Sequence, residues 1–225
     1  MSGTIVIPVY KDDSALEKLL RELRLQAWQS TVVVVDGAGS ASTKAIVELS
    51  AATYLVASPG RGRQIQTALE NVTEGMCMVL HADAFISEQM RSSWNDLVQG
   101  EACWGRFDVK IPGLTVIAAM MNYRSRLTKI CTGDQAMFFH TALLREAGGF
   151  SGLSLMEDIA TSKGLKTHAP EKYRPLRIKV GASPRRWRMQ GVLRTIVSMW
   201  TYRLRFYFGA DAEELYRSYY SRKIT

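Results

Sequence analysis

The chain has 225 residues, of which 47% are hydrophobic and 22% charged, as in an ordinary soluble globular protein. No apolar run approaches the roughly 18 residues that a membrane-spanning helix needs, so we expect no such helix. The formal net charge is +8, and the segment from residue 185 onward holds nine basic side chains against three acids. This excess indicates an anionic partner: a nucleic acid, a lipid surface or a phosphorylated substrate.

The start of the chain and its cysteines indicate a compartment. Residues 1–8 show neither the basic start nor the long apolar stretch of a secretory signal. Cys77, Cys103 and Cys131 are widely spaced and form no CxxC pair. We therefore expect reduced, mostly buried thiols in a cytoplasmic protein.

The first hundred residues alternate between strand and helix patterns. Strands are predicted over residues 4–9, 31–35, 53–57 and 76–83, and helices over residues 14–28, 43–50, 64–71 and 87–98. Such a βα alternation is typical of a mostly parallel central sheet flanked by helices. The class predicted is therefore α/β.

From residue 102 the pattern changes. Further strands are predicted over residues 103–111, 136–140 and 173–180, and helices over residues 113–131, 141–147, 187–208 and 212–221, with another beginning at 156. No internal repeat, low-complexity stretch or linker interrupts the chain. We predict a single domain over residues 1–225.

The last predicted helices are amphipathic and basic. Apolar side chains recur at helical spacing, and arginines interrupt them at three positions: Val192, Leu193, Ile196, Val197, Trp200, Leu204, Tyr207 and Phe208, with Arg194, Arg203 and Arg205. One interpretation is a helix packed on the domain. The alternatives are peripheral contact with an anionic membrane, a homodimer contact, and nucleic-acid binding, for which no recognition motif is present.

Acidic side chains follow two of the predicted strands. Asp36 ends the strand at 31–35, and Asp83 ends the apolar run that begins at Met76. Ligands of open α/β sheets bind at the carboxyl ends of the strands, so both acids are candidates for a binding crevice. A carboxylate there can hold a divalent cation against a diphosphate. A common turn, for Asp36-Gly37, and a solvated strand end, for Asp83, are the alternative interpretations.

A glycine and arginine loop over residues 58–63 is a candidate phosphate cradle. Backbone N–H groups at the start of the following helix could bind phosphate, with Arg61 and Arg63 assisting. The loop lacks the Gly-Lys-Ser/Thr ending of a Walker A motif and the glycine spacing of a dinucleotide fingerprint. A surface turn fits the same pattern.

Two later segments carry further polar groups. Residues 132–135 offer a hydroxyl, an acid and an amide, a combination typical of polar-ligand recognition. Glu157 and Asp158 open a predicted helix. Adjacent acids there either complement the helix dipole or supply a general base with a neighbour that orients it.

Together these residues resemble the pattern of glycosyltransferase family 2, which has the GT-A fold, across residues 4–190. The matching residues are Pro8 and Tyr10 after the first strand, Asp36 after the second, His81, Ala82 and Asp83 in the DXD position, Gly133, Asp134 and Gln135, Glu157 and Asp158, and Arg186 and Trp187. Strings at residues 58–63, 80–83, 104–108, 132–135 and 155–159 are similar to a compact bacterial subgroup labelled as associated with arsenosugar biosynthesis.

The resemblance implies a Rossmann-like GT-A domain and inverting sugar transfer from a nucleotide-diphosphate sugar. Residues 1–100 would bind the donor, residues 101–190 would hold the acceptor and catalytic groups, and residues 187–225 would form the C-terminal helices. Asp83, with His81 as a further candidate, would ligate Mn²⁺ or Mg²⁺. Asp158 would act as the base beside Glu157. The resemblance places Asp36 at the nucleoside, and Arg186 and Trp187 near the diphosphate or acceptor.

The donor side would also include Pro8, Tyr10, Arg61, Arg63 and Ala82. The segment Gly133–Gln135 would contact the acceptor or the diphosphate. The acceptor itself would be a small molecule or a lipid-linked compound, which places the protein in the cytoplasm or at the inner face of the membrane.

Two positions depart from the family pattern. The paired acids after the second strand are here Asp36-Gly37, which puts one nucleoside contact in doubt. His81 stands where the first acid of the DXD motif is usual, and imidazole ligates Mn²⁺ more readily than Mg²⁺. The departure weakens the expectation of tight metal binding and leaves Asp83 in place.

Two other functions stay open. A nucleotidyltransferase of similar fold would carry a glycine-rich loop soon after the first strand, where this chain has Val9-Tyr10-Lys11-Asp12. A non-catalytic module could bind lipid or nucleic acid through the basic segment 185–223. Neither the donor sugar, the base nor the acceptor follows from these motifs.

Overall fold

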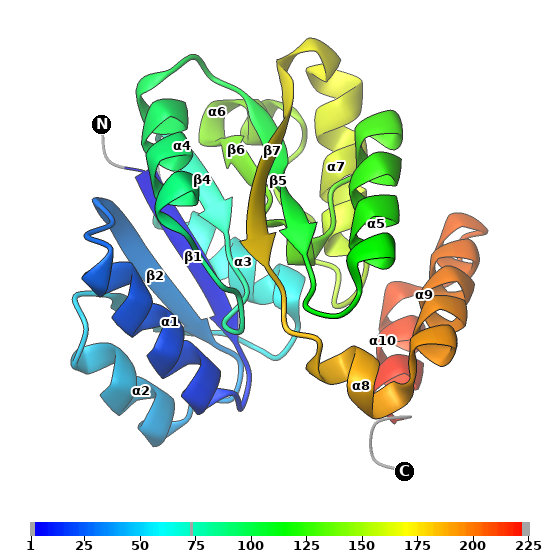
Figure 1. Cartoon of the computed structure of the whole chain (residues 1–225), viewed down its shortest axis with the longest axis horizontal. Coiled ribbons are helices and arrows are strands. Elements are labelled where there is room, and N and C mark those ends of the chain that lie inside the picture. The colour runs from blue at the N-terminus through cyan, green and yellow to red at the C-terminus, as the bar shows by residue number, and fades with distance from the viewer. Residues whose placement is uncertain (1–2, 73, 222–225) are drawn as a thin grey trace.

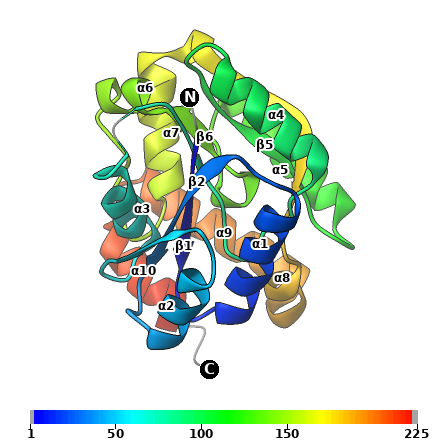
Figure 2. The ribbon, with the colours of Figure 1, turned by 90° about the vertical axis from the view of Figure 1, so that its left-hand side faces the viewer.

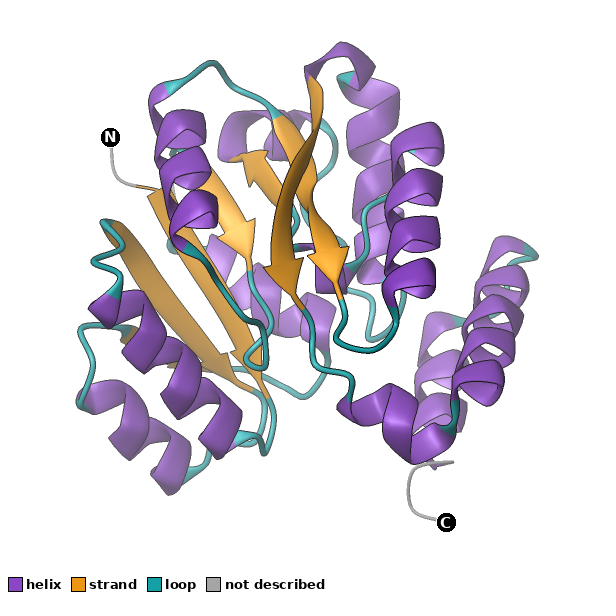
Figure 3. Cartoon of the chain, in the orientation of Figure 1, coloured by secondary structure: helices purple, strands orange, loops and turns teal. Residues whose placement is uncertain are grey.

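The computed structural model describes residues 3–72 and 74–221 (Figures 1 and 3). Seven strands form one sheet in the order β3-β2-β1-β4-β6-β5-β7. Their bounds are β1 Gly3–Val9, β2 Ser30–Asp36, β3 Thr53–Val56, β4 Met76–Val79, β5 Trp104–Lys110, β6 Phe138–His140 and β7 Tyr173–Gly181. Only β6 runs antiparallel to its neighbours β4 and β5 among the described residues. The mostly parallel α/β sheet predicted from the sequence is confirmed.

Helices cover both faces of this sheet. The helices of the domain are α1 Asp13–Leu25, α2 Ala41–Glu48, α3 Arg61–Leu69, α4 Glu88–Gln99, α5 Thr115–Thr128, α6 Thr141–Glu146 and α7 Glu157–His168, with short 3₁₀ turns η1 Gly133–Gln135 and η2 Pro170–Lys172. Figure 2 views the sheet nearly edge-on, with α1 and α4 on one side and α3, α6 and α7 on the other. Two apolar cores therefore form, one on each face.

Alternation along the strands supplies both cores. Ile5 and Ile7 of β1 lie in the core beneath α1 and α4, whereas Val6 between them lies in the core beneath α3. Successive side chains of a strand point to opposite faces, so a strand covered on both sides is a continuous apolar run. This is why the apolar run at residues 4–9 predicted its strand correctly.

The three cysteines are also part of the interior. Cys77, Cys103 and Cys131 are all buried and unpaired, as the sequence predicted. Burial raises the pKa of the Cys77 and Cys131 thiols to about 12, so both are protonated at neutral pH. Within residues 3–72 and 74–221, no helix is long and apolar enough to cross a bilayer.

Several predicted boundaries were wrong. The first helix ends at Leu25 rather than at residue 28, because Ala27 takes a left-handed backbone conformation with φ 51°. The strand predicted to reach Asp83 ends at Val79, and Asp83 lies in the following turn. Helix α3 begins at Arg61, inside the segment predicted to be a loop.

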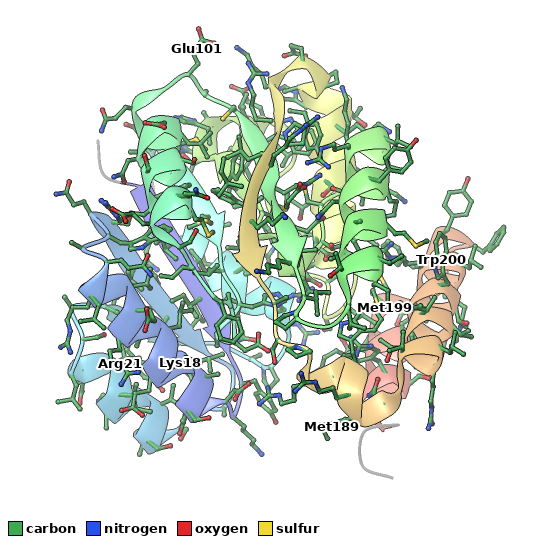
Figure 4. All side chains as sticks on the ribbon, viewed as in Figure 1. Lys18, Arg21, Glu101, Met189, Met199 and Trp200 are labelled. Atoms are coloured by element: carbon green, nitrogen blue, oxygen red, sulfur yellow. The ribbon has the colours of Figure 1, made fainter. Side chains whose placement is uncertain are left out.

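The long helix predicted over residues 187–208 is also wrong. It is broken at Gly191, whose φ of 80° no helix accommodates, into α8 Arg185–Gln190 and α9 Val192–Tyr207. The helix predicted over residues 212–221 is confirmed as α10 Ala212–Ser221. In Figures 1 and 4 these three helices stand together at one side of the molecule, where Figure 4 labels Met189, Met199 and Trp200. Arg222 and Lys223 of the basic segment lie outside the described residues.

A buried charge network lies where β5 meets α5. The Arg106 side chain is fully buried and donates to the Ser125 hydroxyl at 3.0 Å and the Asn122 carbonyl at 2.9 Å. It also pairs with Asp108, which accepts a second bond from Arg126 Nη2 at 2.6 Å. The string at residues 104–108, noted in the sequence as part of a family pattern, therefore holds the core together.

Replacing Asp108 with alanine should destabilise the fold, because Arg106 would keep a buried charge without its carboxylate. Loss of one partner of a buried pair costs about 3–5 kcal/mol. Urea denaturation of the Asp108→Ala protein measures this loss. The matched control is Arg126→Gln, whose side chain is partly exposed and should cost about 1 kcal/mol or less. A loss below about 1 kcal/mol for Asp108→Ala would contradict the assignment.

Candidate functional site

The Arg61 side chain is the centre of a polar cluster at the carboxyl edge of the sheet. Its guanidinium pairs with Glu157 through Nε and donates from Nη1 to His81 Nε2 at 2.8 Å. A third nitrogen, Nη2, lies 3.6 Å from Asp158 Oδ2. Segments from α3, from the loop after β4 and from α7 thus meet at one side chain.

Local backbone geometry brings these segments together. Met156 precedes α7 in a left-handed conformation with φ 65°, a conformation that is uncommon for methionine and that turns the chain into the helix at Glu157. Gly133 lies against the cluster, where an added Cβ would come within 2.5 Å of His81 Nε2 and 2.6 Å of Arg61 Nη1. Only glycine lets the η1 segment approach this closely.

The two adjacent acids occupy different environments. Asp158 Oδ2 accepts from the Gly133 N–H at 2.8 Å, and its Oδ1 accepts from the Ile159 N–H at 2.7 Å. Asp158 keeps 9% of its surface exposed, whereas Glu157 keeps 1%. Asp158 is thus a carboxylate of fixed orientation that still reaches solvent.

Glu157 is a buried carboxyl with one free oxygen. Its Oε2 has no hydrogen-bond partner among the described residues. Burial raises the pKa of Glu157, the Asp158 charge raises it further, and Arg61 opposes both. The pKa of Arg61 is raised in turn, because its two carboxylate neighbours outweigh the effect of burial on the guanidinium.

His81 connects the cluster to a second acid. Because a guanidinium can only donate, His81 Nε2 accepts from Arg61, and Nδ1 carries the proton that faces Asp134 Oδ1 at 3.4 Å. Although burial acts to raise the pKa of Asp134, the hydrogen bond from His81 and the charges of Arg61 and Arg186 lower it. Asp134 is therefore an anion held beside the imidazole.

A small hollow lies next to this pair. His81, Asp83 and Asp134 line it together with Gly133 and residues of β7 and the loop that follows, and its volume is about 10 Å³, room for one water-sized particle. The two carboxylates suit a hard divalent cation, whereas both nitrogens of His81 are engaged by Arg61 and Asp134. No three His, Cys, Asp or Glu within 3–72 and 74–221 stand close enough to hold a metal by themselves, so a bound cation would need oxygen atoms from a ligand.

Asp36 lies at the end of β2 as predicted, but both of its oxygens are engaged. They accept from the Ala38 N–H at 2.8 Å, from the Ser40 N–H at 2.6 Å and from the Tyr54 hydroxyl at 3.0 Å. Burial and the bond to Asp36 raise the pKa of Tyr54 to about 12. Asp36 shapes the turn that follows β2, and its contact with a nucleoside stays a prediction.

The other predicted site residues are dispersed around this cluster. Arg63 points away from it and pairs with Glu213 of α10 at 3.0 Å. Trp187 is buried in the core between α5 and α8, while Arg186 packs on the Tyr219 ring within electrostatic reach of Asp134. The remaining four lie as follows: Pro8 is half-buried in β1, Tyr10 is exposed just beyond it, Ala82 is buried beside His81, and Gln135 is buried and caps η1.

Sequence reasoning missed Gln64. Its side-chain amide donates to the Val9 carbonyl at 2.8 Å and to the Val35 carbonyl at 2.7 Å, which clamps the ends of β1 and β2 beneath the Asp36 turn. The only available signal was its place four residues after Gly60, in the first turns of α3. A glutamine in a helix gives no indication that it reaches across to two strands.

Comparison with known proteins supports the fold. No protein-family model matches the chain, and no curated protein matches it in sequence. A mannosyltransferase from Pyrobaculum calidifontis, solved with GDP-mannose and Mn²⁺, is similar in structure with TM-score 0.62 and 20% identity, over 80% of this chain and 56% of that one. This chain thus spans little more than half of that protein.

Glucosyl-3-phosphoglycerate synthase from Mycobacterium tuberculosis is also similar in structure. Its complex with Mn²⁺, UDP-glucose and phosphoglyceric acid aligns with TM-score 0.58 and 12% identity, over 79% of this chain and 70% of that one. Its complex with Mg²⁺ and UDP aligns with TM-score 0.58 and 13% identity, over 80% and 70%. The chain has the GT-A fold of these glycosyltransferases, as the family resemblance implied.

Removing the Arg61 charge should make stability depend more strongly on pH. The pKa of Glu157 lies above its ordinary value of 4.5, so folding favours the protonated carboxyl, and this contribution to stability is lost as the pH rises through the folded pKa. Arg61→Met removes the group that opposes the rise. Relative to the unaltered protein, the variant should lose about 3 kcal/mol more of its free energy of unfolding at pH 8 than at pH 4.5. Urea denaturation at the two pH values measures this difference.

The control is the double variant Arg61→Met/Glu157→Gln, which has no carboxyl at residue 157 to titrate. It should show little of the additional loss above pH 4.5. An equal pH dependence in the single and double variants would contradict the assignment to Glu157.

Proposed function

We propose that the chain is an inverting, metal-dependent glycosyltransferase, similar to family 2, that moves a sugar from a nucleotide-diphosphate donor to an acceptor hydroxyl. The observation that carries this proposal is the position of Asp158. Its carboxylate is held by Gly133 and Arg61 and reaches solvent. A second link, from Arg61 through His81, connects Asp158 to the acidic hollow. Solved structures of similar fold hold nucleotide sugars with Mn²⁺.

On the donor side, Asp83 and Asp134 would hold Mn²⁺ or Mg²⁺ together with diphosphate oxygens. The metal, when bound, neutralises the charge that develops on the leaving diphosphate. Direct ligation by His81 stays a prediction. In this structure its Nε2 accepts a hydrogen bond from Arg61 and does not point to a free position for a metal. Asp36, with Pro8 and Tyr10 at the neighbouring strand end, would contact the nucleoside, and the start of α3 would lie near the phosphates.

On the acceptor side, Asp158 would remove the proton from the attacking hydroxyl. The oxygen would form a bond to the anomeric carbon from the face opposite the diphosphate, and the bond to the diphosphate would break with its electron pair. Such a displacement inverts the configuration at that carbon. Glu157 would be a positioning residue, because it is buried and holds Arg61 beside the base.

The environment of Asp158 fits this role. A general base must lie within hydrogen-bond reach of the proton that it removes. Of the two adjacent acids, only Asp158 is exposed enough to meet that requirement. The N–H donors of Gly133 and Ile159 fix the orientation of the carboxylate before substrate arrives. A base that is already oriented avoids part of the entropic cost of positioning.

Two substitutions separate the donor and acceptor roles. Asp158→Asn keeps the size of the side chain but cannot accept a proton, so transfer should fall by about 10²–10⁴-fold, while binding of a nucleotide sugar with Mn²⁺ should remain. A nucleotide sugar should raise the melting temperature of the unaltered protein more with Mn²⁺ than without it. Asp83→Asn should abolish this additional rise. Thermal-shift measurements and a transfer assay on both variants test the pair.

The exposed acid Asp96 of α4 offers a matched control, and Asp96→Asn should change neither readout. Normal transfer by Asp158→Asn would contradict its role as the base. Release of pyrophosphate from a nucleoside triphosphate and a sugar phosphate would instead favour the nucleotidyltransferase alternative. In this chain β1 leads into α1 through Tyr10 to Asp12, without a glycine-rich loop.

We propose in addition that the molecule contacts the cytoplasmic face of an anionic membrane through α5 and α9. Each helix exposes an apolar stripe at helical spacing, formed by Val116, Met120, Tyr123 and Leu127 on α5 and by Leu193, Val197, Trp200 and Leu204 on α9. Neither helix contains an acid that would repel an anionic lipid surface. An apolar stripe on a helix without acids favours such a surface.

Substitution of Leu193 and Val197 with serine should weaken binding to phosphatidylglycerol vesicles in a co-sedimentation assay by about tenfold, since two exposed apolar side chains are lost. Leu49→Ser is the control, because Leu49 is equally exposed but lies on the far side of the sheet at the end of α2. If the unaltered protein fails to sediment with these vesicles at low salt, the membrane proposal is wrong.

A further inference from the structure

Two arginines, Arg124 of α5 and Arg203 of α9, lie within electrostatic reach of Asp158, and Arg203 also acts on Arg124. On α5, Arg124 follows Ile117 and Met121 at helical spacing, and on α9, Arg203 follows Ile196 and Met199 in the same way. All four apolar residues pack on the core formed by Val109, Ile111, Ala118 and Trp187. The two arginines therefore lie on the sides of α5 and α9 that carry these core residues.

Neither arginine has a partner that accounts for its position. Nε and Nη2 of Arg124 are buried without a hydrogen bond, and no hydrogen bond or ion pair of Arg203 occurs within the described part of the chain. Both arginines are half-buried, and guanidinium groups withdrawn from water are ordinarily paired, because the lost hydration of the charge is otherwise uncompensated. An unpaired pair of like charges is the opposite of what stabilises a fold.

The electrostatics agree with this geometry. Burial and the Arg203 charge lower the pKa of Arg124 to about 10, and burial lowers that of Arg203. Asp158 acts on both arginines in the opposite direction, so it lies within electrostatic reach of each.

The nearby acids do not serve as their counter-ions. Asp158 is already held by Gly133, Ile159 and Arg61. Asp134 faces the His81 imidazole. The two arginines are thus a cationic site without an anion, next to the carboxylate assigned as the base.

We propose that Arg124 and Arg203 bind an oxyanion carried by the acceptor, a phosphate or carboxylate group, and so bring a hydroxyl of the same molecule to Asp158. This inference rests on the proposed function and names its acceptor class as anionic alcohols. Guanidinium groups are suited to it, because their planar N–H fork matches phosphate and carboxylate oxygens. The anion could belong to a soluble compound or to a lipid phosphate.

Inorganic phosphate tests the site directly, by calorimetric titration of the full chain. We expect binding to the unaltered protein and a loss of about tenfold or more in Arg124→Gln and in Arg203→Gln. Arg194→Gln is the control, since Arg194 lies on α9 but is exposed, and its affinity for phosphate should be unchanged. Absence of phosphate binding, or equal affinity in the arginine variants, would overturn the inference.

A second measurement separates binding from a structural role. Without phosphate, Arg203→Met should raise the melting temperature, because it removes repulsion from Arg124 and keeps an apolar side chain of similar length. A structural arginine would give a lower melting temperature, and this result would also overturn the inference.

Binding of UDP-glucose and GDP-mannose with Mn²⁺ is measured on the same proteins. Loss of phosphate affinity with donor binding retained supports the anion site, whereas failure of the unaltered protein to bind any donor contradicts the proposed function alone. Glycerol 3-phosphate and a short-chain, water-soluble phosphatidic acid then distinguish the two sources of the anion. Stronger binding of the first identifies a soluble acceptor, and stronger binding of the second a lipid acceptor.

Discussion

The Arg61 guanidinium is the contact on which the arrangement of the site depends. It binds Glu157 in the interior, His81 after β4 and the carboxylate of Asp158. His81 lies far in the chain from the adjacent pair Glu157 and Asp158, so a single side chain fixes the relative position of these two segments. Because Glu157 is buried, the pair with Arg61 cannot be exchanged for water without leaving an uncompensated charge. The geometry around the proposed base is therefore set before any substrate binds.

The division of work between the two adjacent acids follows from burial. Glu157 faces the interior and anchors the arginine, while Asp158, one residue further on, keeps 9% of its surface exposed and is the acid proposed to accept the proton. The same arginine reaches the acidic hollow through His81, so the proposed base and the proposed metal corner share one support. Gly133 closes the arrangement, because any larger residue would displace both Arg61 and His81.

Much of the fold could be predicted from the sequence, since apolar runs covered on both faces are easily recognised as strands. The predicted acids at Asp83 and Asp158 do come to one edge of the sheet. The break at Gly191 was missed because the apolar spacing continues across it. The string ending at Asp108 was interpreted as a family motif, although its charged side chains form a buried network in the core. The cationic site that includes Arg203 depends on how two distant helices are placed, which no local pattern records.

A crystal structure of the protein with GDP or UDP and Mn²⁺ tests the central claim most directly, because anomalous scattering locates the metal without reference to the protein. We expect Mn²⁺ in the hollow lined by His81, Asp83 and Asp134, bound by Asp83, by Asp134 and by oxygens of the diphosphate, with Asp158 facing the side where the sugar would lie. A nucleotide bound elsewhere on the molecule, or Mn²⁺ bound away from Asp83, would contradict it.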